Sequence, residues 1–353
     1  FGNLAIIFNA TCFVSVVSLC GQETLIVRSW DEYGTKRPSL ARGVFLFGAR
    51  LTLAASFLAA VVTGLLWFAW KPSVSVSLVL AACAFLFVHS LLQFTGQFSR
   101  VAAGMVIGEV PRELLWRVLV IVGIGAFHVL DLDFEVREFF LTAAVAIFAA
   151  IVLQYLMTRS AIPPVIKLAK PEYDFGTWLP RSFKMWTSAL MDTTGQYLEI
   201  VLIGFVLGPT AAGIYFVATR ITNVFAMITG SISIYATSRI SALFYSDSRA
   251  QLQHMLRSLA IISVVINGAA LLSIIVLGKL LLWTFGPAYV DAFPALMILA
   301  VGASIGALVG PSTHILLLTG HEGAYPRIMG AILAIRALLI VVLAPLYGVL
   351  GAA

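Results

Sequence analysis

The sequence predicts an all-α, polytopic membrane protein with about ten visible transmembrane helices. Of its 353 residues, 61% are hydrophobic and 11% are charged, whereas soluble domains average roughly 45–50% apolar and about 25% charged residues. The apolar residues fall into blocks of about twenty, which as helix span the ~30 Å hydrocarbon core of a bilayer. This composition argues against a soluble enzyme, a nucleic-acid-binding protein and a disordered scaffold.

The expected spans are apolar blocks bounded by charged residues, Gly or Pro. They lie near 4–26, 44–69, 75–95, 114–130, 139–157, 185–207, 212–236, 257–284, 293–319 and 328–346. The connectors between them are short, so no folded domain fits outside the membrane and any chemistry belongs inside the bundle or at its faces. Because the chain starts and stops in apolar sequence, we expect a fragment at both ends.

Lys and Arg are distributed unevenly between the connectors. One alternating set of connectors holds sixteen of the 22, and the opposite set holds three, namely Lys71, Arg137 and Lys279. Positive residues remain on the cytoplasmic side, so the first set is predicted to be cytoplasmic. The other three fall within predicted spans: Arg50, Arg220 and Arg336.

The longest predicted cytoplasmic connector is rich in proline and divides five spans from five. Its prolines are Pro163, Pro164, Pro171 and Pro180. We therefore expect an N-terminal helical lobe over 1–157, an inter-lobe connector over 158–184 and a C-terminal helical lobe over 185–353.

Two carboxylates lie in the predicted span 185–207. An ionisable residue at bilayer depth costs roughly 2.5–3.5 kcal/mol, so it should face a cavity or a partner. At about 100° per residue, Asp192 and Glu199 share one stripe of the helix, which must line something polar. On the next span, Arg220 and Asn223 share a face, and equal depth predicts an ion pair between Glu199 and Arg220.

Two further cations have different expected surroundings. Arg336 lies near mid-membrane with no acidic residue in its own span. It is expected either to bond to backbone carbonyls or to line a site for an anion, because guanidinium matches phosphate geometry and stays charged when buried. Arg50 is expected to pair with Glu23 near the cytoplasmic ends of the first two spans.

Small residues recur at a spacing of four in the span 293–319, followed by a proline. These residues are Gly302, Gly306, Gly310 and Pro311. They predict a face that admits a neighbouring helix closely and a kink after it. Segment 302–306 also matches the GxSxG pattern of hydrolases, but its place inside a membrane helix argues against a nucleophile. ATP binding is unsupported, because Leu280 follows Lys279 where a phosphate loop requires Ser or Thr.

Four segments carry a resemblance to a known family: Gly21–Arg28 (GQETLIVR), Gly208–Ile221 (GPTAAGIYFVATRI), Phe285–Phe293 (FGPAYVDAF) and Leu346–Ala353 (LYGVLGAA). In these the chain resembles bacterial polysaccharide or O-antigen flippases of the multidrug/oligosaccharidyl-lipid/polysaccharide exporter superfamily. The resemblance implies a two-lobed, V-shaped transporter of 12 to 14 helices. The ten visible spans would then be the second to the eleventh, with the first helix and the end of the second lobe missing.

The function implied by the resemblance is the transfer of undecaprenyl-diphosphate-linked oligosaccharide across the bacterial inner membrane for polysaccharide biosynthesis. Alternating access would carry the sugar and diphosphate from the cytoplasmic to the periplasmic leaflet. The expected substrate-binding residues are Arg336, Arg220, Asn223 and Arg50. No cofactor or metal is expected; a proton or sodium gradient would act through Asp192 or Glu199. The expected partners are the lipid-linked substrate, membrane lipids and the polysaccharide polymerase machinery, and no nucleic acid.

Three other functions remain open. A multidrug or cation antiporter of the same superfamily would favour an acidic lining, against which the net charge of +6 and Arg336 argue. A peptidoglycan precursor flippase would share the chemistry and differ in the headgroup. A membrane glycosyltransferase or polymerase would require a sizeable catalytic loop, which the short connectors do not supply.

Overall fold

The computed structural model describes residues 2–71, 73–245, 249–308 and 324–353. These residues form helices joined by short turns, with no strand among them, which confirms the all-α prediction. Contacts divide the chain into an N-terminal unit, Ile7–Leu198, and a C-terminal unit, Phe1–Ile6 with Glu199–Ala353. Each unit is a separate helical assembly and is described by itself.

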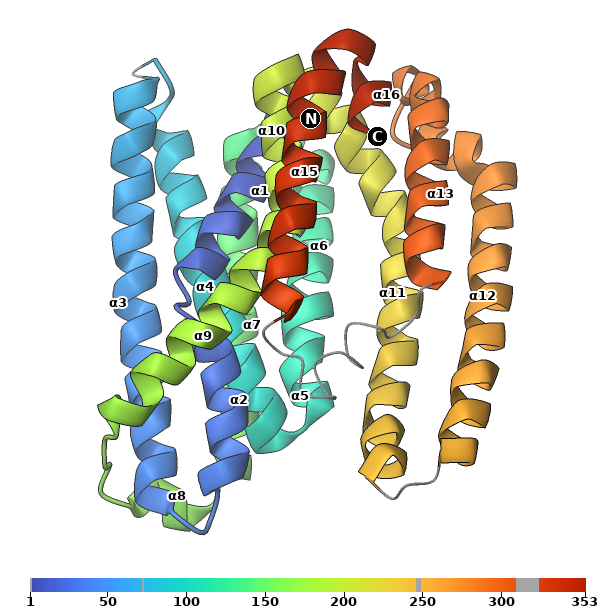
Figure 1. Cartoon of the computed structure of the whole chain (residues 1–353). Coiled ribbons are helices and arrows are strands. Elements are labelled where there is room, and N and C mark those ends of the chain that lie inside the picture. The colour runs from blue at the N-terminus through green and yellow to red at the C-terminus, as the bar shows by residue number, and fades with distance from the viewer. Residues whose placement is uncertain (1, 72, 246–248, 309–323) are drawn as a thin grey trace. The chain divides into compact units, whose positions relative to one another are not determined.

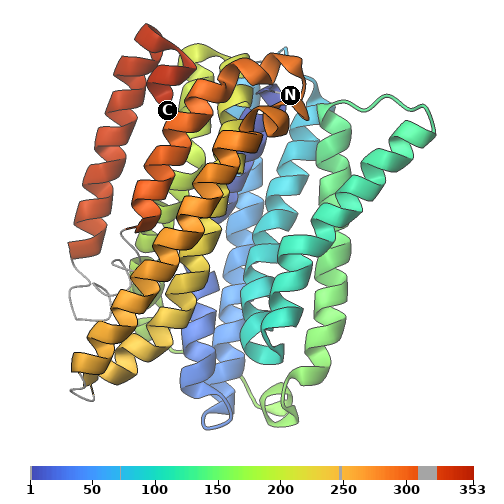
Figure 2. The ribbon, with the colours of Figure 1, turned by 90° about the vertical axis from the view of Figure 1, so that its right-hand side faces the viewer.

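The N-terminal unit contains the helices drawn from blue to light green in Figure 1. These are α1 (Gly2–Val17), α2 (Gln22–Tyr33), α3 (Pro38–Trp70), α4 (Val76–Ala103), α5 (Met105–Glu109), α6 (Trp116–Val129), α7 (Val136–Ala161), α8 (Pro164–Leu168) and α9 (Phe175–Thr193). A π-helical turn, Val110–Leu115, connects α5 to α6, and a loop at one end of the unit returns the chain from α6 to α7 (Figure 2).

The first predicted span is broken. Where the sequence predicts one helix over 4–26, α1 and α2 meet at a bend of 47°. Cys20 and Gly21 adopt positive φ angles of 50° and 74° at the break. A Cβ at Gly21 would lie 2.3 Å from the backbone oxygen of Ser182 on α9, so glycine allows both the left-handed backbone and this close approach.

Small side chains pack α3 against α4. The buried residues of α3 recur every four positions: Gly48, Thr52, Ser56, Ala60 and Gly64. Cys83 on α4 donates its Sγ–H to the carbonyl oxygen of Ala60 at 3.2 Å, which shows how closely the backbones approach. On the other side of α3, Leu58 and Leu66 are exposed. This is the pattern of membrane helices, in which small residues face the neighbour and large apolar residues face lipid.

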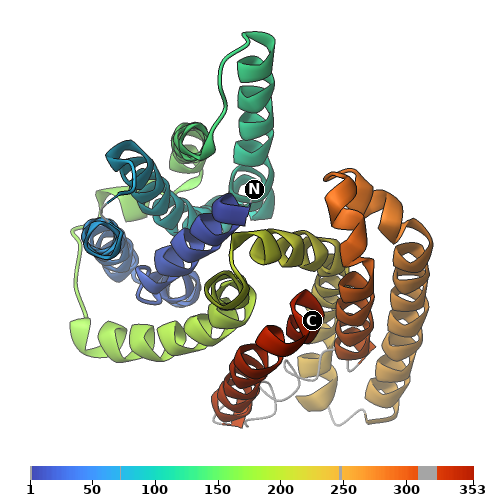
Figure 3. The ribbon, with the colours of Figure 1, turned by 90° about the horizontal axis from the view of Figure 1, so that it is seen from above.

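The predicted connector 158–184 packs on the N-terminal unit. Arg42 Nη1 donates to the carbonyl oxygen of Ala169 at 2.7 Å, and Trp178 Nε1 donates to the hydroxyl of Tyr33 at 3.0 Å. Helix α9 is strongly inclined to α3, which is seen end-on in Figure 3. The contact boundary therefore falls between Leu198 and Glu199, beyond the connector that the sequence marks as the division between lobes.

The C-terminal unit contains the remaining helices, drawn from yellow-green to red in Figure 1. They are α10 (Glu199–Leu207), α11 (Pro209–Tyr245), α12 (Arg249–Trp283), α13 (Phe293–Leu308), α15 (Ala324–Tyr347) and α16 (Val349–Ala352). Helices α11, α12 and α13 share one apolar core, which includes Val217, Phe225, Ile274 and Leu296.

The buried face of α13 differs from the expected one. A Cβ added at Gly302 or Gly306 would meet no atom within 4 Å, whereas Ala300, Ser304 and Ala307 are buried. The structure therefore packs α13 through alanine and serine instead of through the two glycines. The other predicted members of this motif, Gly310 and Pro311, lie outside the described residues.

Seven helices in the described part of the chain are long and apolar enough to cross a membrane, and the bent pair α1–α2 makes up to eight. The predicted span 114–130 corresponds to the 14-residue α6, which continues from α5 through the π-helical turn. The predicted span 185–207 comprises the end of α9, a second π-helical turn at Thr194–Leu198, and α10. The polytopic membrane architecture is as predicted, and the predicted number of ten transmembrane helices is approximate.

Candidate functional site

The candidate site is a carboxylate shared by an arginine and a tyrosine in the C-terminal unit. Arg336 Nε on α15 lies 2.5 Å from Glu199 Oε1 on α10. The Tyr215 hydroxyl on α11 donates to Glu199 Oε2 at 3.2 Å. Three helices thus place one cation and one hydroxyl donor on a single carboxylate.

Glu199 is positioned by an irregular backbone. It is the first residue of α10 and directly follows the π-helical turn Thr194–Leu198. A π-helical turn bonds residue i to i+5 and is found frequently at functional sites. The wider turn also interrupts the 100° repeat between Asp192 and Glu199, so the straight stripe predicted from the sequence does not continue through this segment.

The carboxylate lies in an apolar environment, but its cationic partner is partly accessible. Glu199 is 8% exposed and Tyr215 is 1% exposed, and the surrounding core includes Ile203 and Ile340. The Arg336 side chain is 48% exposed. The closest contact of the ion pair is made by Nε.

Arg336 has no acidic residue in its own span, but Glu199 pairs with it from another helix. Glu199 was predicted to pair with Arg220 on the assumption of a loop over Gly208–Ala211. Gly208 alone connects α10 to α11. Glu199 is nine residues before Gly208 and Arg220 is twelve after it, so Arg220 lies about 4.5 Å out of register at 1.5 Å per residue.

Arg220 instead places its guanidinium carbon 4.8 Å from the centre of the Phe216 ring. Its neighbour on the same helix, Asn223, is half-buried. Both are on α11, as predicted, but the described contacts do not join them to the Glu199 carboxylate.

The remaining predicted residues belong to the N-terminal unit. Arg50 is on α3 of the N-terminal unit and donates Nη1 to the hydroxyl of Tyr173 at 3.3 Å. The described ion pairs do not include the expected pair of Arg50 with Glu23, whose Oε2 is buried without a hydrogen-bond partner. The Asp192 side chain lies outside the described residues.

Tyr215 is the one member of the cluster that the sequence analysis missed. A signal for it exists: in a helical hairpin whose turn is Gly208, Glu199 is nine residues before the turn and Tyr215 is seven after it. With a one-residue turn, these two positions come to similar depth. The positive φ of 89° at Gly208 makes so short a turn feasible.

The groups of this site can bind anions and cations. Among the described residues, no group of three or more His, Cys, Asp or Glu side chains is placed to hold a metal ion. A guanidinium that is accessible to solvent can bind an oxyanion in two parallel hydrogen bonds. A carboxylate in an apolar environment can accept a proton or a small cation when its arginine is engaged elsewhere.

The fold is similar to that of solved membrane transporters. A multidrug resistance MATE family transporter of the MOP superfamily, in its inward-facing conformation, is 14% identical, with 99% of this chain and 84% of that chain covered and a TM-score of 0.67. A MATE transporter in a bent conformation is 13% identical, with 98% and 80% covered and a TM-score of 0.62. An outward-facing MATE family transporter is 13% identical, with 99% and 81% covered and a TM-score of 0.57.

No protein-family model and no curated protein matches the sequence. At these identities the structural likeness establishes the fold alone, which is the one seen in these MATE family transporters.

Proposed function

We propose that the chain is a flippase that moves a lipid-linked oligosaccharide between the leaflets of the bacterial inner membrane. The observation that carries this proposal is Arg336, which is half-exposed and paired with one carboxylate. Its two terminal nitrogens can take the diphosphate of the lipid carrier in a bidentate manner. The cargo would be undecaprenyl-diphosphate-linked, as the sequence resemblance implies.

When no cargo is bound, Arg336 forms an ion pair with Glu199. The substrate diphosphate competes with the Glu199 carboxylate for the guanidinium. When the diphosphate takes Arg336, the carboxylate loses its cation in an apolar environment, and uptake of a proton or sodium ion restores neutrality. The Tyr215 hydroxyl remains as a donor to the carboxylate. This exchange couples an ion gradient to cargo binding without ATP, and Asp192 is the second candidate for the ion.

Alternating access is the transport mode that accompanies this fold. The similar structures include an inward-facing and an outward-facing state of MATE family transporters, which supports the same cycle for this chain. In our proposal Arg220, Asn223 and Arg50 contribute further contacts to the cargo. The product would pass to the polysaccharide polymerase machinery on the periplasmic side.

Multidrug or cation antiport is the second candidate, because two of the similar structures are multidrug resistance MATE family transporters. A cationic drug requires free carboxylates, but Glu199 is already paired with Arg336. The net charge of +6 also favours an anionic cargo. A peptidoglycan precursor is an anionic cargo of the same chemistry, so headgroup assays must separate it from an oligosaccharide carrier.

The deciding experiment is transport in proteoliposomes with the arginine varied. Fluorescent undecaprenyl-diphosphate oligosaccharide, undecaprenyl-diphosphate-linked peptidoglycan precursor and a cationic dye are supplied in parallel, each with and without a proton or sodium gradient. Arg336→Lys should retain part of the oligosaccharide flipping, and Arg336→Ala should lower it at least about tenfold per folded molecule, the loss of about 1.4 kcal/mol or more of binding.

Lys279→Ala is the matched control, since it removes a cation of the same unit that lies 5.3 Å from the Phe293 ring. Near-normal flipping per molecule by Arg336→Ala would remove this residue from the cargo site. Dye transport without oligosaccharide flipping would replace the flippase assignment with an antiporter.

A further inference from the structure

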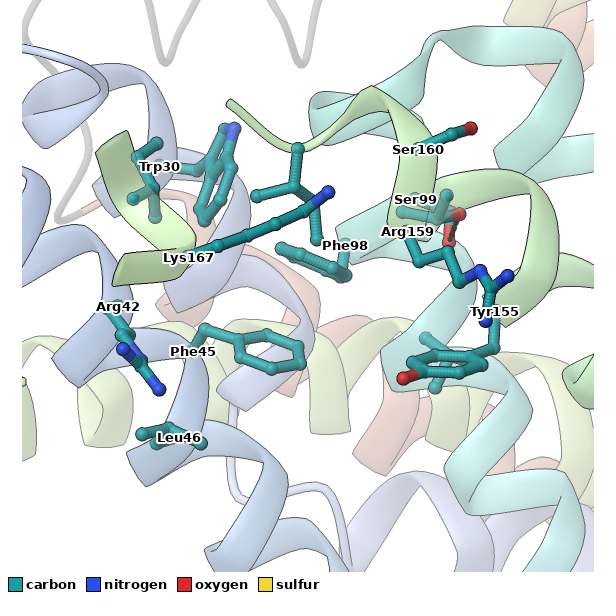
Figure 4. Close-up of a pocket in the computed structure, with 14 residues that line it drawn as sticks. Trp30, Arg42, Phe45, Leu46, Phe98, Ser99, Tyr155, Arg159, Ser160 and Lys167 are labelled. Atoms are coloured by element: carbon teal, nitrogen blue, oxygen red, sulfur yellow. Dashed lines mark hydrogen bonds between the residues drawn. The ribbon is translucent and has the colours of Figure 1, made fainter. Parts of the chain in front are cut away.

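A cavity of about 620 Å³ opens in the N-terminal unit, far along the sequence from the Glu199 cluster. This volume is within the roughly 300–1,000 Å³ of pockets that hold small ligands. Its walls come from α2, α3, α4, the end of α7, and α8 (Figure 4). The lining residues at the ends of α3 and α7 belong to connectors with the Lys and Arg excess, so the cavity is at the predicted cytoplasmic headgroup level.

Three cations line the cavity without any acidic residue. Arg42, Arg159 and Lys167 are among its lining residues, and none of the three forms an ion pair within the described part of the chain. Arg42 donates to the backbone oxygen of Ala169, which fixes its position, whereas Arg159 and Lys167 are exposed. The cavity therefore has positive charge that the protein does not neutralise.

The rest of the wall is aromatic and apolar. Phe98 lies between two other rings, 5.0 Å from Trp30 and 4.3 Å from Phe45, measured between ring centres. Figure 4 shows Lys167 extending across the face of the cavity near Trp30 and Phe98, with Arg42 on one side and Arg159 beside Tyr155 on the other. Two polar groups of the wall bond to each other, since the Thr158 hydroxyl donates to Ser99 Oγ at 2.8 Å.

We infer that this cavity binds an anionic glycerophospholipid of the surrounding leaflet. Its phosphate lies among Lys167, Arg159 and Arg42, and the upper part of one acyl chain lies on Phe45 and Phe98. A soluble anion would use the cations but leave the aromatic wall facing water, and a neutral lipid would use the wall but leave the cations unpaired. Basic pockets between membrane helices at the cytoplasmic level are suited to such headgroups.

Native mass spectrometry of the purified full-length chain with added phosphatidylglycerol tests this inference. Arg159→Gln/Lys167→Gln removes two exposed cations, so the fold should be retained. At about fivefold per surface cation, the double variant should bind phosphatidylglycerol roughly 30-fold more weakly than the unmodified chain. Lys36→Gln/Lys170→Gln is the matched control, because it makes the same charge change at two connector lysines outside the cavity lining.

A second variant fills the cavity without altering its charge. Leu46→Trp should also weaken binding, while phosphatidylethanolamine should bind weakly to every variant. Equal phosphatidylglycerol affinity of the cavity variant and its control would overturn the inference. It would also be overturned by equal binding of phosphatidylethanolamine, or by displacement of the lipid with millimolar inorganic phosphate, which would indicate a soluble anion. None of these outcomes depends on transport activity.

Discussion

Two groups of ion pairs among the described residues differ in how their partners are brought together. Around the π-helical turn Val110–Leu115, Arg112 contacts Glu109 at 2.6 Å and Glu113 at 3.3 Å. The remaining pairs of this network are Arg100 with Glu109 and Arg117 with Glu113, at 3.5 Å and 2.9 Å. In each of these pairs the two partners are at most nine residues apart in the sequence.

In the candidate site, by contrast, Glu199 and Arg336 are 137 residues apart (336 minus 199). In the network near Arg112, one residue contacts more than one partner. If Glu109 or Glu113 is substituted, Arg112 still contacts the other carboxylate. Within the described residues, the buried Glu199 has one cationic partner. A local network therefore tolerates the loss of one member, whereas the distant pair should respond strongly to a change in either residue.

The largest expected effect comes from removing the cation of the distant pair. Arg336→Gln leaves the Glu199 carboxylate uncompensated and should destabilise the C-terminal unit by about 2–3 kcal/mol. This is less than the roughly 3–5 kcal/mol of a fully buried pair, because the Arg336 side chain is 48% exposed. Glu199→Gln should cost less, since the remaining arginine can reach solvent.

A double-mutant cycle sharpens this expectation. The free energy of unfolding can be measured in detergent by thermal or denaturant titration. The double variant Arg336→Gln/Glu199→Gln should lose about as much of it as Glu199→Gln alone. Strict additivity of the two single changes would show that the pair is not coupled.

An intermediate effect is expected from Tyr215→Phe. This change removes a hydroxyl that donates to Glu199, and hydrogen bonds to charged groups contribute about 1.5–3 kcal/mol. The same detergent unfolding measurement in a Glu199→Gln background provides the control. There the cost should fall by about half, because the acceptor is neutral; an equal cost in both backgrounds would assign the effect to packing of the Tyr215 ring.

The smallest effects are expected in the local network. Arg112→Ala should cost about 1 kcal/mol, because this side chain is 14% exposed and contacts two carboxylates. Arg117→Ala removes an exposed i,i+4 pair and should cost about 0.3–0.5 kcal/mol, a difference that high salt diminishes. A larger effect from Arg117 than from Arg112 would contradict this ranking.

The sequence predicted the architecture better than the backbone details. Composition and apolar blocks predict an all-α membrane bundle because hydrophobic length is a property of the chain itself. Hydropathy does not detect a change in the backbone hydrogen-bond pattern, so the break at Cys20–Gly21 and the two π-helical turns were not predicted. Each depends on contacts with other helices, as the packing of Gly21 against Ser182 shows.

The sequence identified Glu199 and Arg336 as candidate site residues, but it did not predict that they form an ion pair with each other. Glu199 and Arg336 were identified because charge inside an apolar span requires a partner or a cavity. Which helix supplies that partner depends on how α10, α11 and α15 pack together, and hydropathy does not contain this information. The length of one turn, Gly208, was enough to move Arg220 away from the predicted register.

The break between α1 and α2 has a consequence for the synthesis of the chain. The Gln22 amide donates to Ser182 Oγ at 2.6 Å across 160 residues, and Trp186 Nε1 donates to the carbonyl oxygen of Val17 at 2.9 Å. At about 5–20 residues per second, a ribosome needs roughly 8–32 s to translate the residues that separate the first pair. During that time the bend has polar groups whose final partners do not yet exist. We therefore expect the first span to remain accessible to the insertion machinery until α9 emerges, which site-specific crosslinking of stalled chains would detect.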